Sequence, residues 1–407
     1  MSGKAAVTGD TEIDVDIDID VDFETKSPMQ EERLSIREIQ KDGYPDFLLK
    51  EINEQPQVIR DTIEHRFNDK TRTLVFDELF LTDAELADID RIYIVASGTS
   101  YHAGLVGKDL IEGWARIPVE VEHSSEFRHK NPIITSNTLV IAISQSGETF
   151  DTIEATRLSR RIGAHVIALT NAIDSRITQE AQSVLYVKAN VERAVVATKT
   201  FLAELTLLVL LGLYFAQERM LLTGPQIQEI YGEMKLLPGQ IEKILKSTCS
   251  IEEAAEACLD APSVLFIGRG LGAAICYEGA HKLKEISYVH AEAFFAGEVK
   301  YGPIALIDPK TATPIIAIAT QNSTRDKIVA DMTEMKARGA QVIAIAAEGD
   351  EQIKEIADYV IGIPPSRECL SPITTSVPLQ LFAREIASAR GYDVDQPRNL
   401  AKAVTVE

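Results

Sequence analysis

The chain is poor in cysteine, in basic residues and in long apolar runs. Its 407 residues include four cysteines without a CxxC pair, which excludes a disulfide-rich scaffold and gives no zinc-binding spacing. Acidic residues outnumber basic ones by 62 to 41, a formal net charge of −21 that disfavours nucleic acid and anionic membranes as partners. We therefore expect a cytoplasmic protein in a reducing environment.

No segment predicts a membrane anchor or a secretion signal. The most apolar run, residues 205–216, is shorter than the roughly 20 residues that a spanning helix needs. The N-terminus lacks the apolar core of a signal peptide. Hydrophobic residues make up 45% of the chain, as in globular proteins, and the length predicts two to three domains.

The N-terminal region predicts a tail followed by helix. Residues 1–36 include Ile13 to Asp20, where apolar residues alternate with aspartates, and a strand face made only of carboxylates would repel itself. We therefore predict an acidic disordered tail. Residues 37–79 form a predicted helical lead-in, with apolar residues at helical spacing from about residue 36 to residue 66 and an interruption at Pro56.

A set of four strand-and-loop units occurs twice in the same order. Strands are predicted at 92–96, 139–143, 165–170 and 184–187, and again roughly 174 residues later at 264–268, 315–319, 342–346 and 359–363. Short buried strands that alternate with helices are typical of parallel sheets. We predict an α/β protein with two homologous doubly wound domains, residues 80–222 and 254–391, and a C-terminal tail, residues 392–407.

Hydroxyl-rich loops follow two strands of the first copy. They contain Thr99, Ser100, Ser144, Gln145, Ser146 and Thr149. Such loops before a helix N-terminus offer hydroxyls, N–H groups and the positive helix end to an anion, and neighbouring loops of an open sheet meet at one edge. We predict one phosphate site, although these residues could also serve only as helix caps. The loop of the second copy, residues 320–325, is less suited to an anion.

One helical face and the C-terminus complete the candidates. Glu278, Lys282 and Glu285 share one face if their segment is helical. This face could be a solvated ion-pair surface, or Glu285 could be a general base beside a cation. The composition of the C-terminal segment gives no reason to single out Lys402.

Four longer segments carry a resemblance to a known enzyme family. They are GTSYHAG (98–104), SQSGETFDT (144–152), EGAHKLKEISYVHAEAFFAGEVKYGP (278–303) and DVDQPRNLAKAVTVE (393–407). In this order they resemble the isomerase half of glucosamine-6-phosphate synthase, the glutamine:fructose-6-phosphate aminotransferase. The resemblance runs from about Leu49 to the last residue. It implies two sugar-isomerase (SIS) domains, a phosphosugar substrate and a homodimer.

The resemblance also implies roles for particular residues. Glu285 matches the base that moves a proton between C1 and C2, with Lys282 beside it. Lys402 matches the lysine that forms a Schiff base with the ketose, so no organic cofactor is expected. No metal is expected either, because the seven histidines show no HxxxH pair or Cys/His ligand spacing. The remaining matches are Glu278 and Ala401 for sugar binding and, for the phosphate, Thr99, Ser100, Ser144, Gln145, Ser146 and Thr149. A lysine attacks a carbonyl only when neutral, and closure of the tail over the site would favour that form.

The sequence departs from the family at three places. The family enzymes begin with a glutaminase domain, whereas this chain begins Met1-Ser2-Gly3, so we expect no glutamine hydrolysis. Tyr301 stands where the family has a ring-opening histidine that reaches in from the neighbouring subunit. Tyrosine ordinarily has a pKa near 10 against about 6.5 for histidine, which makes it a poorer acid or base at neutral pH. Ala197 replaces a serine near the sugar.

These features predict an amino-sugar-phosphate isomerase that interconverts fructose 6-phosphate plus ammonia and glucosamine 6-phosphate. Ammonia would come from solution or from a separate glutaminase subunit. One alternative is a deaminase of glucosamine 6-phosphate or a related amino sugar phosphate. Another is a non-catalytic regulator that binds sugar phosphates, but the presence of both Glu285 and Lys402 favours an enzyme.

Overall fold

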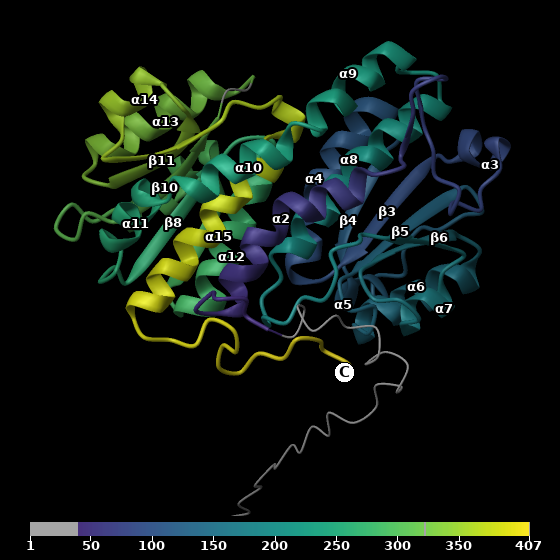
Figure 1. Cartoon of the computed structure of the whole chain (residues 1–407), viewed down its shortest axis with the longest axis horizontal. Helices are drawn as coiled ribbons and strands as arrows, with labels where there is room; N and C mark the ends of the chain where they lie inside the picture. The colour runs from purple at the N-terminus through teal and green to yellow at the C-terminus, as the bar shows by residue number, and fades with distance from the viewer. Residues whose placement is uncertain (1–39, 321–322, 407) are drawn as a thin grey trace, which may run out of the picture. The chain divides into compact units, whose positions relative to one another are not determined.

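Two five-stranded parallel sheets organise the part of the chain that the computed structural model describes, residues 40–320 and 323–406 (Figure 1). The first sheet has the order β4-β3-β5-β6-β7 and the second β9-β8-β10-β11-β12. The strands are β3 (Arg91–Ala96), β4 (Val119–His123), β5 (Thr138–Ser144), β6 (His165–Thr170), β7 (Ser183–Tyr186), β8 (Ser263–Gly268), β9 (His290–Phe295), β10 (Pro314–Ala319), β11 (Gln341–Ala347) and β12 (Tyr359–Ile363). The shared order confirms the predicted pair of homologous α/β domains.

The helices follow the alternation that the sequence predicts. They are α2 (Phe47–Ile63), α3 (Asp83–Asp88), α4 (Gly98–Ala115), α5 (Ser124–Phe127), α6 (Phe150–Ile162), α7 (Arg176–Glu180), α8 (Lys199–Glu218), α9 (Gly224–Met234), α10 (Leu237–Lys246), α11 (Cys249–Glu256), α12 (Leu271–Ser287), α13 (Arg325–Ala337), α14 (Glu351–Ile356) and α15 (Ser371–Ala389). Short 3-10 helices are η2 (Ala296–Tyr301), η3 (Pro303–Leu306) and η4 (Glu368–Leu370), and a small hairpin is formed by β1 (Phe67–Asn68) and β2 (Thr73–Leu74).

The central strands are apolar at successive positions because both faces of each sheet are covered. In β3, Ile92 and Ile94 point into the large core, whereas Tyr93 and Val95 pack in a separate cluster with Ile153 of α6. Strands that are buried on both faces lose the alternation of polar and apolar residues. This is why the central strands were predictable from short apolar runs.

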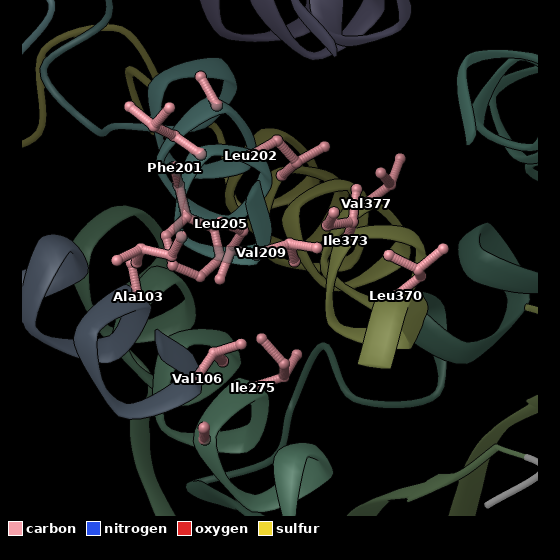
Figure 2. Close-up of a cluster of buried hydrophobic side chains, with 14 of the residues drawn as sticks. Ala103, Val106, Phe201, Leu202, Leu205, Val209, Ile275, Leu370, Ile373 and Val377 are labelled. Carbon is pink, nitrogen blue, oxygen red and sulfur yellow. The ribbon is translucent and has the colours of Figure 1, made fainter. Parts of the chain in front are cut away.

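Four helices form a layer between the two sheets. Figure 2 shows their apolar side chains meeting in one cluster, with Ala103 and Val106 from α4, Phe201, Leu202, Leu205 and Val209 from α8, Ile275 from α12, and Ile373 and Val377 from α15. By length and composition α8 could cross a membrane, but 89% of its apolar window is buried in this core. The apolar segment is thus longer than the predicted run, and it serves as a core helix.

The N-terminal lead-in differs from its prediction. The helix begins at Phe47 rather than near residue 37, because the side chain of Asp46 caps it by accepting the N–H of Leu49 at 2.7 Å. Gly43, with φ +87°, lies in the turn before it. Pro56 lies inside α2 and does not end it. The predicted acidic tail, residues 1–36, lies outside the described residues.

Candidate functional site

A cavity of about 120 Å³ opens at the carboxyl ends of β3 and β5. Both hydroxyl-rich loops contribute to it. Its lining consists of Ser97, Thr99, Ser100, Ile143, Ser144, Gln145, Ser146, Thr149, Val195, Ala197 and Lys402. The structure therefore brings together all six residues that the sequence assigns to phosphate binding, while their role as phosphate ligands stays a prediction.

The second loop is shaped by a tight turn after β5. Gly147 has φ +66°, and a Cβ at this position would lie 2.0 Å from the Oγ of Ser175, so a side chain cannot be accommodated. The Oγ of Ser144 accepts the N–H of Gly147 at 3.1 Å and lies 2.8 Å from the Oγ1 of Thr149. Because Thr149 is the N-cap of α6, the start of this helix borders the cavity. A helix N-terminus favours an anion there.

The first turn of α4 connects the cavity to the second domain. Thr99 donates from Oγ1 to Glu278 Oε1 of α12 at 3.2 Å, and the other oxygen of Glu278 lies 2.7 Å from His102 Nδ1. The Oγ of Ser100 lies 2.9 Å from Glu204 Oε1 of α8. Each of these two cavity hydroxyls therefore contacts a buried carboxyl group.

Glu278, Lys282 and Glu285 form one ion cluster on α12, in which Glu278 and Lys282 are buried and Glu285 is partly buried. The Nζ of Lys282 lies 3.3 Å from Glu278 Oε1 and 2.5 Å from Glu285 Oε2, and its side chain is 2% exposed. The interpretation of this face as a solvated ion-pair surface is therefore wrong, because packing against the first domain covers it. Burial alone would raise the pKa of Glu285, but Lys282 and His281 lower it to about 2.

The C-terminal tail returns from the second domain to the cavity of the first. Its backbone is fixed by two hydrogen bonds, from the N–H of Val195 to Asp395 O at 2.9 Å and from the N–H of Phe150 to Val404 O at 3.0 Å. Between them, Lys402 Nζ donates to Glu192 Oε2 at 3.0 Å and to Ala194 O at 2.7 Å. An amine therefore lies among the hydroxyls of the cavity.

Five predicted residues do not line the cavity within this chain: Glu278, Lys282, Glu285, Tyr301 and Ala401. Glu285 connects to it only indirectly, through Lys282, Glu278 and Thr99. Tyr301, at the end of η2, is 81% exposed. Ala401, the other predicted sugar contact, is also exposed.

Sequence reasoning missed two buried acids near the cavity. Glu192 accepts hydrogen bonds from the N–H of Thr198 and from Lys402, and although burial alone would raise its pKa, Lys402 lowers it. Glu204 is the only acid in the first three quarters of the apolar helix α8, and burial raises its pKa to about 8. A lone carboxylate in an otherwise apolar helix was the available signal.

Two histidines of the same region were also missed. His281 Nε2 lies 3.2 Å from Glu285 Oε1, and its ring is 5.4 Å from that of His102, centroid to centroid. Both histidines therefore stand beside carboxylates of the α12 cluster. Among the described residues, no three His, Cys, Asp or Glu side chains gather as they would to hold a metal ion.

Comparisons with known proteins agree with this architecture. Residues 85–214 and 259–390 each match the SIS domain. The chain is 46% identical over 368 residues, 90% of its length, to a protein of Clostridium acetobutylicum called glutamine--fructose-6-phosphate aminotransferase [isomerizing]. It is 45% identical over 93% of its length to a protein of the same name from Caldanaerobacter subterraneus subsp. tengcongensis. The chain spans 60% and 62% of the length of these two relatives.

Solved structures show the same fold. The C-terminal domain of glucosamine-fructose-6-phosphate aminotransferase from Francisella tularensis is 35% identical with a TM-score of 0.82, and the match covers 88% of this chain and 100% of that one. A glucosamine-6-phosphate deaminase from Thermotoga maritima has a TM-score of 0.68 over 88% of this chain and 99% of that one. At 22% identity, this second likeness shows a shared fold alone.

Proposed function

From its membership of the SIS domain family, in the group of the C-terminal domain of glucosamine-fructose-6-phosphate aminotransferase, we propose an activity for this chain. It interconverts fructose 6-phosphate plus ammonia and glucosamine 6-phosphate. One observation carries the proposal. A cavity lined by hydroxyl-rich loops also contains the amine of Lys402, so an anion site and a nucleophile lie within one small volume.

The hydroxyls and the starts of α4 and α6 would anchor the phosphate. The neutral amine of Lys402 would then attack the C2 carbonyl of the open-chain ketose, and loss of water would leave an imine. Ammonia would replace the lysine at C2 and restore the free amine. Phosphate binding far from the reacting carbons supplies orientation for these steps.

Glu285 would move the proton in the last step. Removal of a proton from C1 of the C2 imine gives an enolamine. Return of the proton to C2, together with loss of the O1 proton and gain of a proton by the nitrogen, yields the aldehyde at C1 and the amine at C2. With a pKa of about 2, Glu285 is a carboxylate at neutral pH, which is the form a proton acceptor needs. The connection from Glu285 through Lys282 and Glu278 to Thr99 supports its action at this cavity.

The assembly and the amine source belong to the same proposal. We propose a cytoplasmic homodimer in which the segment around Tyr301 completes the partner's cavity, since Tyr301 is exposed and lies outside the cavity of its own chain. Tyr301 would hydrogen-bond the sugar ring, or the substrate would enter already open. Ammonia would come from solution or from a separate glutaminase subunit.

Turnover of the purified protein tests the proposal. Fructose 6-phosphate is supplied with ammonium or with glutamine, and deamination of glucosamine 6-phosphate is measured in parallel. We expect glucosamine 6-phosphate with ammonium and none with glutamine, and no product from Lys402→Ala. Sugar phosphate binding without turnover in either direction would contradict the enzyme and favour the regulator.

A further inference from the structure

The two hydroxyls at the start of α4 differ in the carboxyl group behind them. Thr99 faces Glu278, whose neighbours Lys282 and His102 lie within 3.3 Å and 2.7 Å. Ser100 faces Glu204, whose side chain is buried in the helical core. Both hydroxyls line the cavity, so the state of each carboxyl group decides what each hydroxyl can offer a ligand.

Glu278 is ionised at neutral pH. Burial alone would raise its pKa, but Lys282 and His102 lower it below the ordinary value. An ionised carboxylate only accepts hydrogen bonds, so the single hydrogen of Thr99 is committed to it. The hydroxyl of Thr99 can therefore offer a ligand only its lone pairs, so it is not among the hydroxyls that would anchor the phosphate.

Glu204 is in the opposite situation. Its Oε1 contacts Ser100, and its Oε2 is buried with no hydrogen-bond partner among the described residues. Among the described residues no cation forms an ion pair with it, although the charge of Lys282 partly opposes the rise of its pKa. Burial, and secondarily the charges of Glu192 and Glu278, raise its pKa to about 8, which keeps it neutral at physiological pH. A neutral carboxyl group can donate a hydrogen bond as well as accept one.

We propose that protonated Glu204 is a positioning residue of the phosphate site, which donates to the Oγ of Ser100 across the 2.9 Å contact and so frees the hydrogen of Ser100 for the anion. This inference rests on the proposed function of the cavity. When Glu204 loses its proton, the contact reverses. Ser100 then donates to Glu204 and presents only lone pairs to the phosphate, and a negative charge lies behind the site.

The groups around Glu204 come from four elements. Ser100 lies on α4, Glu278 and Lys282 on α12, and Glu192 in the segment before α8. On α2, Glu51 lies against Glu192, and its pKa is also raised to about 8 by burial and by that neighbour. Because Glu51 and Glu204 both have a pKa of about 8, a pH dependence of binding near pH 8 can be assigned to Glu204 only with a variant that removes this carboxyl group alone.

Calorimetric titration with fructose 6-phosphate between pH 7 and 9.5, without ammonia, provides the test. With a second pKa near 6, the phosphate group is mostly dianionic at pH 7 and almost fully so from pH 8 upward, so its own ionisation contributes little where the decline is expected. For the native protein we expect affinity to fall by up to about tenfold per pH unit above pH 8, and binding at pH 9 to take up close to one proton. Glu204→Gln keeps a donor toward Ser100 and cannot ionise, so its affinity should stay nearly constant and its excess proton uptake should vanish.

A second variant separates positioning from packing. Glu204→Met fills the site but offers no donor, so we expect weaker binding at every pH with no alkaline decline, and thermal melts check that both variants fold. If Glu204→Gln declines with pH as the native protein does, or binds as weakly as Glu204→Met, the inference is wrong while the proposed function stands. If no form binds fructose 6-phosphate at any pH, both are wrong.

Discussion

The two domains share one strand order but treat the same sheet edge in different ways. In the first, the loops after β3 and β5 leave hydroxyls around a cavity of about 120 Å³. In the second, the corresponding edge holds a pocket of about 10 Å³ that Thr320, Ser366 and apolar side chains line. Topology therefore provides the edge, and the side chains placed there decide whether a ligand fits.

Several polar groups of the second edge pair with one another, whereas the buried Oγ1 of Thr320 has no hydrogen-bond partner among the described residues. Ser323 donates from Oγ to Glu368 at 3.0 Å, and Arg325 Nη2 lies 2.6 Å from Asp350 Oδ1. The second domain instead contributes the ion cluster of α12, which packs against α4 of the first. Under the proposed function, the two copies divide the work, with the first domain binding the anion and the second contributing the group that transfers the proton.

The largest difference in turnover is expected between two variants at equivalent positions of α12 and α4. Glu285 lies in the last turn of α12, and Glu112 lies in the last turn of α4, where its Oε1 is 2.7 Å from Lys108 Nζ. Glu285→Gln should lower kcat by about 10²- to 10⁴-fold, because it removes the proposed proton carrier. Steady-state kinetics with fructose 6-phosphate and ammonium measure this loss.

Glu112→Gln is the matched control. Its partly exposed ion pair is expected to contribute less than about 1 kcal/mol to stability and nothing to turnover. Equal losses in both variants would contradict the assignment of proton transfer to the second domain alone.

A smaller effect should distinguish the two loops. Ser146 lines the cavity, whereas the hydroxyl of Ser323 already donates to Glu368. Ser146→Ala should raise KM by about tenfold or more with kcat nearly unchanged, since a hydrogen bond to a charged group contributes about 1.5–3 kcal/mol. Ser323→Ala should leave KM at the native value, and a rise there would mean that the second edge also binds substrate.

The smallest effect concerns the buried acids and stability. The pKa of Glu204 is raised from 4.5 to about 8, so between these values the unfolded chain releases a proton that the folded chain keeps, and stability falls as the pH rises. Melting temperatures of Glu204→Gln should therefore exceed the native ones by a few degrees at pH 8.5, with a smaller difference at pH 5.

The second domain provides the opposite case for comparison. Its buried Asp331 is paired with Arg269 at 2.8 Å, so Asp331→Asn should destabilise the fold by breaking an ion pair.

A melting difference between Glu204→Gln and the native protein that does not change with pH would contradict the assigned ionisation of Glu204.

Much of the fold could be read from local pattern. The eight predicted strands lie within one residue of their predicted bounds. Six of them are internal strands, whose burial on both faces leaves a clear apolar run, and the other two, β7 and β12, are partly exposed edge strands. The edge strands β4 and β9 were missed because each has an exposed face, so glutamates interrupt their apolar residues, as in Val119-Glu120-Val121-Glu122. The small hairpin of β1 and β2 was also missed, since each strand has two residues.

The site was predictable only where its residues were close in sequence. The loops and the face of α12 follow from local spacing. Lys402 meets Glu192 across 210 positions, and no local pattern records such a contact, so only the family resemblance pointed to it. Glu204 was missed because its proposed role depends on its contact with the hydroxyl of Ser100 on α4, a residue about 100 positions away in the sequence.

The position of Lys402 in the C-terminal tail also determines the order in which the parts of the cavity are synthesised. Both hydroxyl-rich loops leave the ribosome with the first sheet, whereas Lys402 is added about 250 residues after Thr149, which at 5–20 residues per second means a delay of roughly 10 to 50 seconds. Under the proposed function, the nascent chain would carry an anion pocket without its amine throughout that interval. A sugar phosphate that enters early would then help the first domain to fold, as a ligand does, while no covalent chemistry would begin before Lys402 is added.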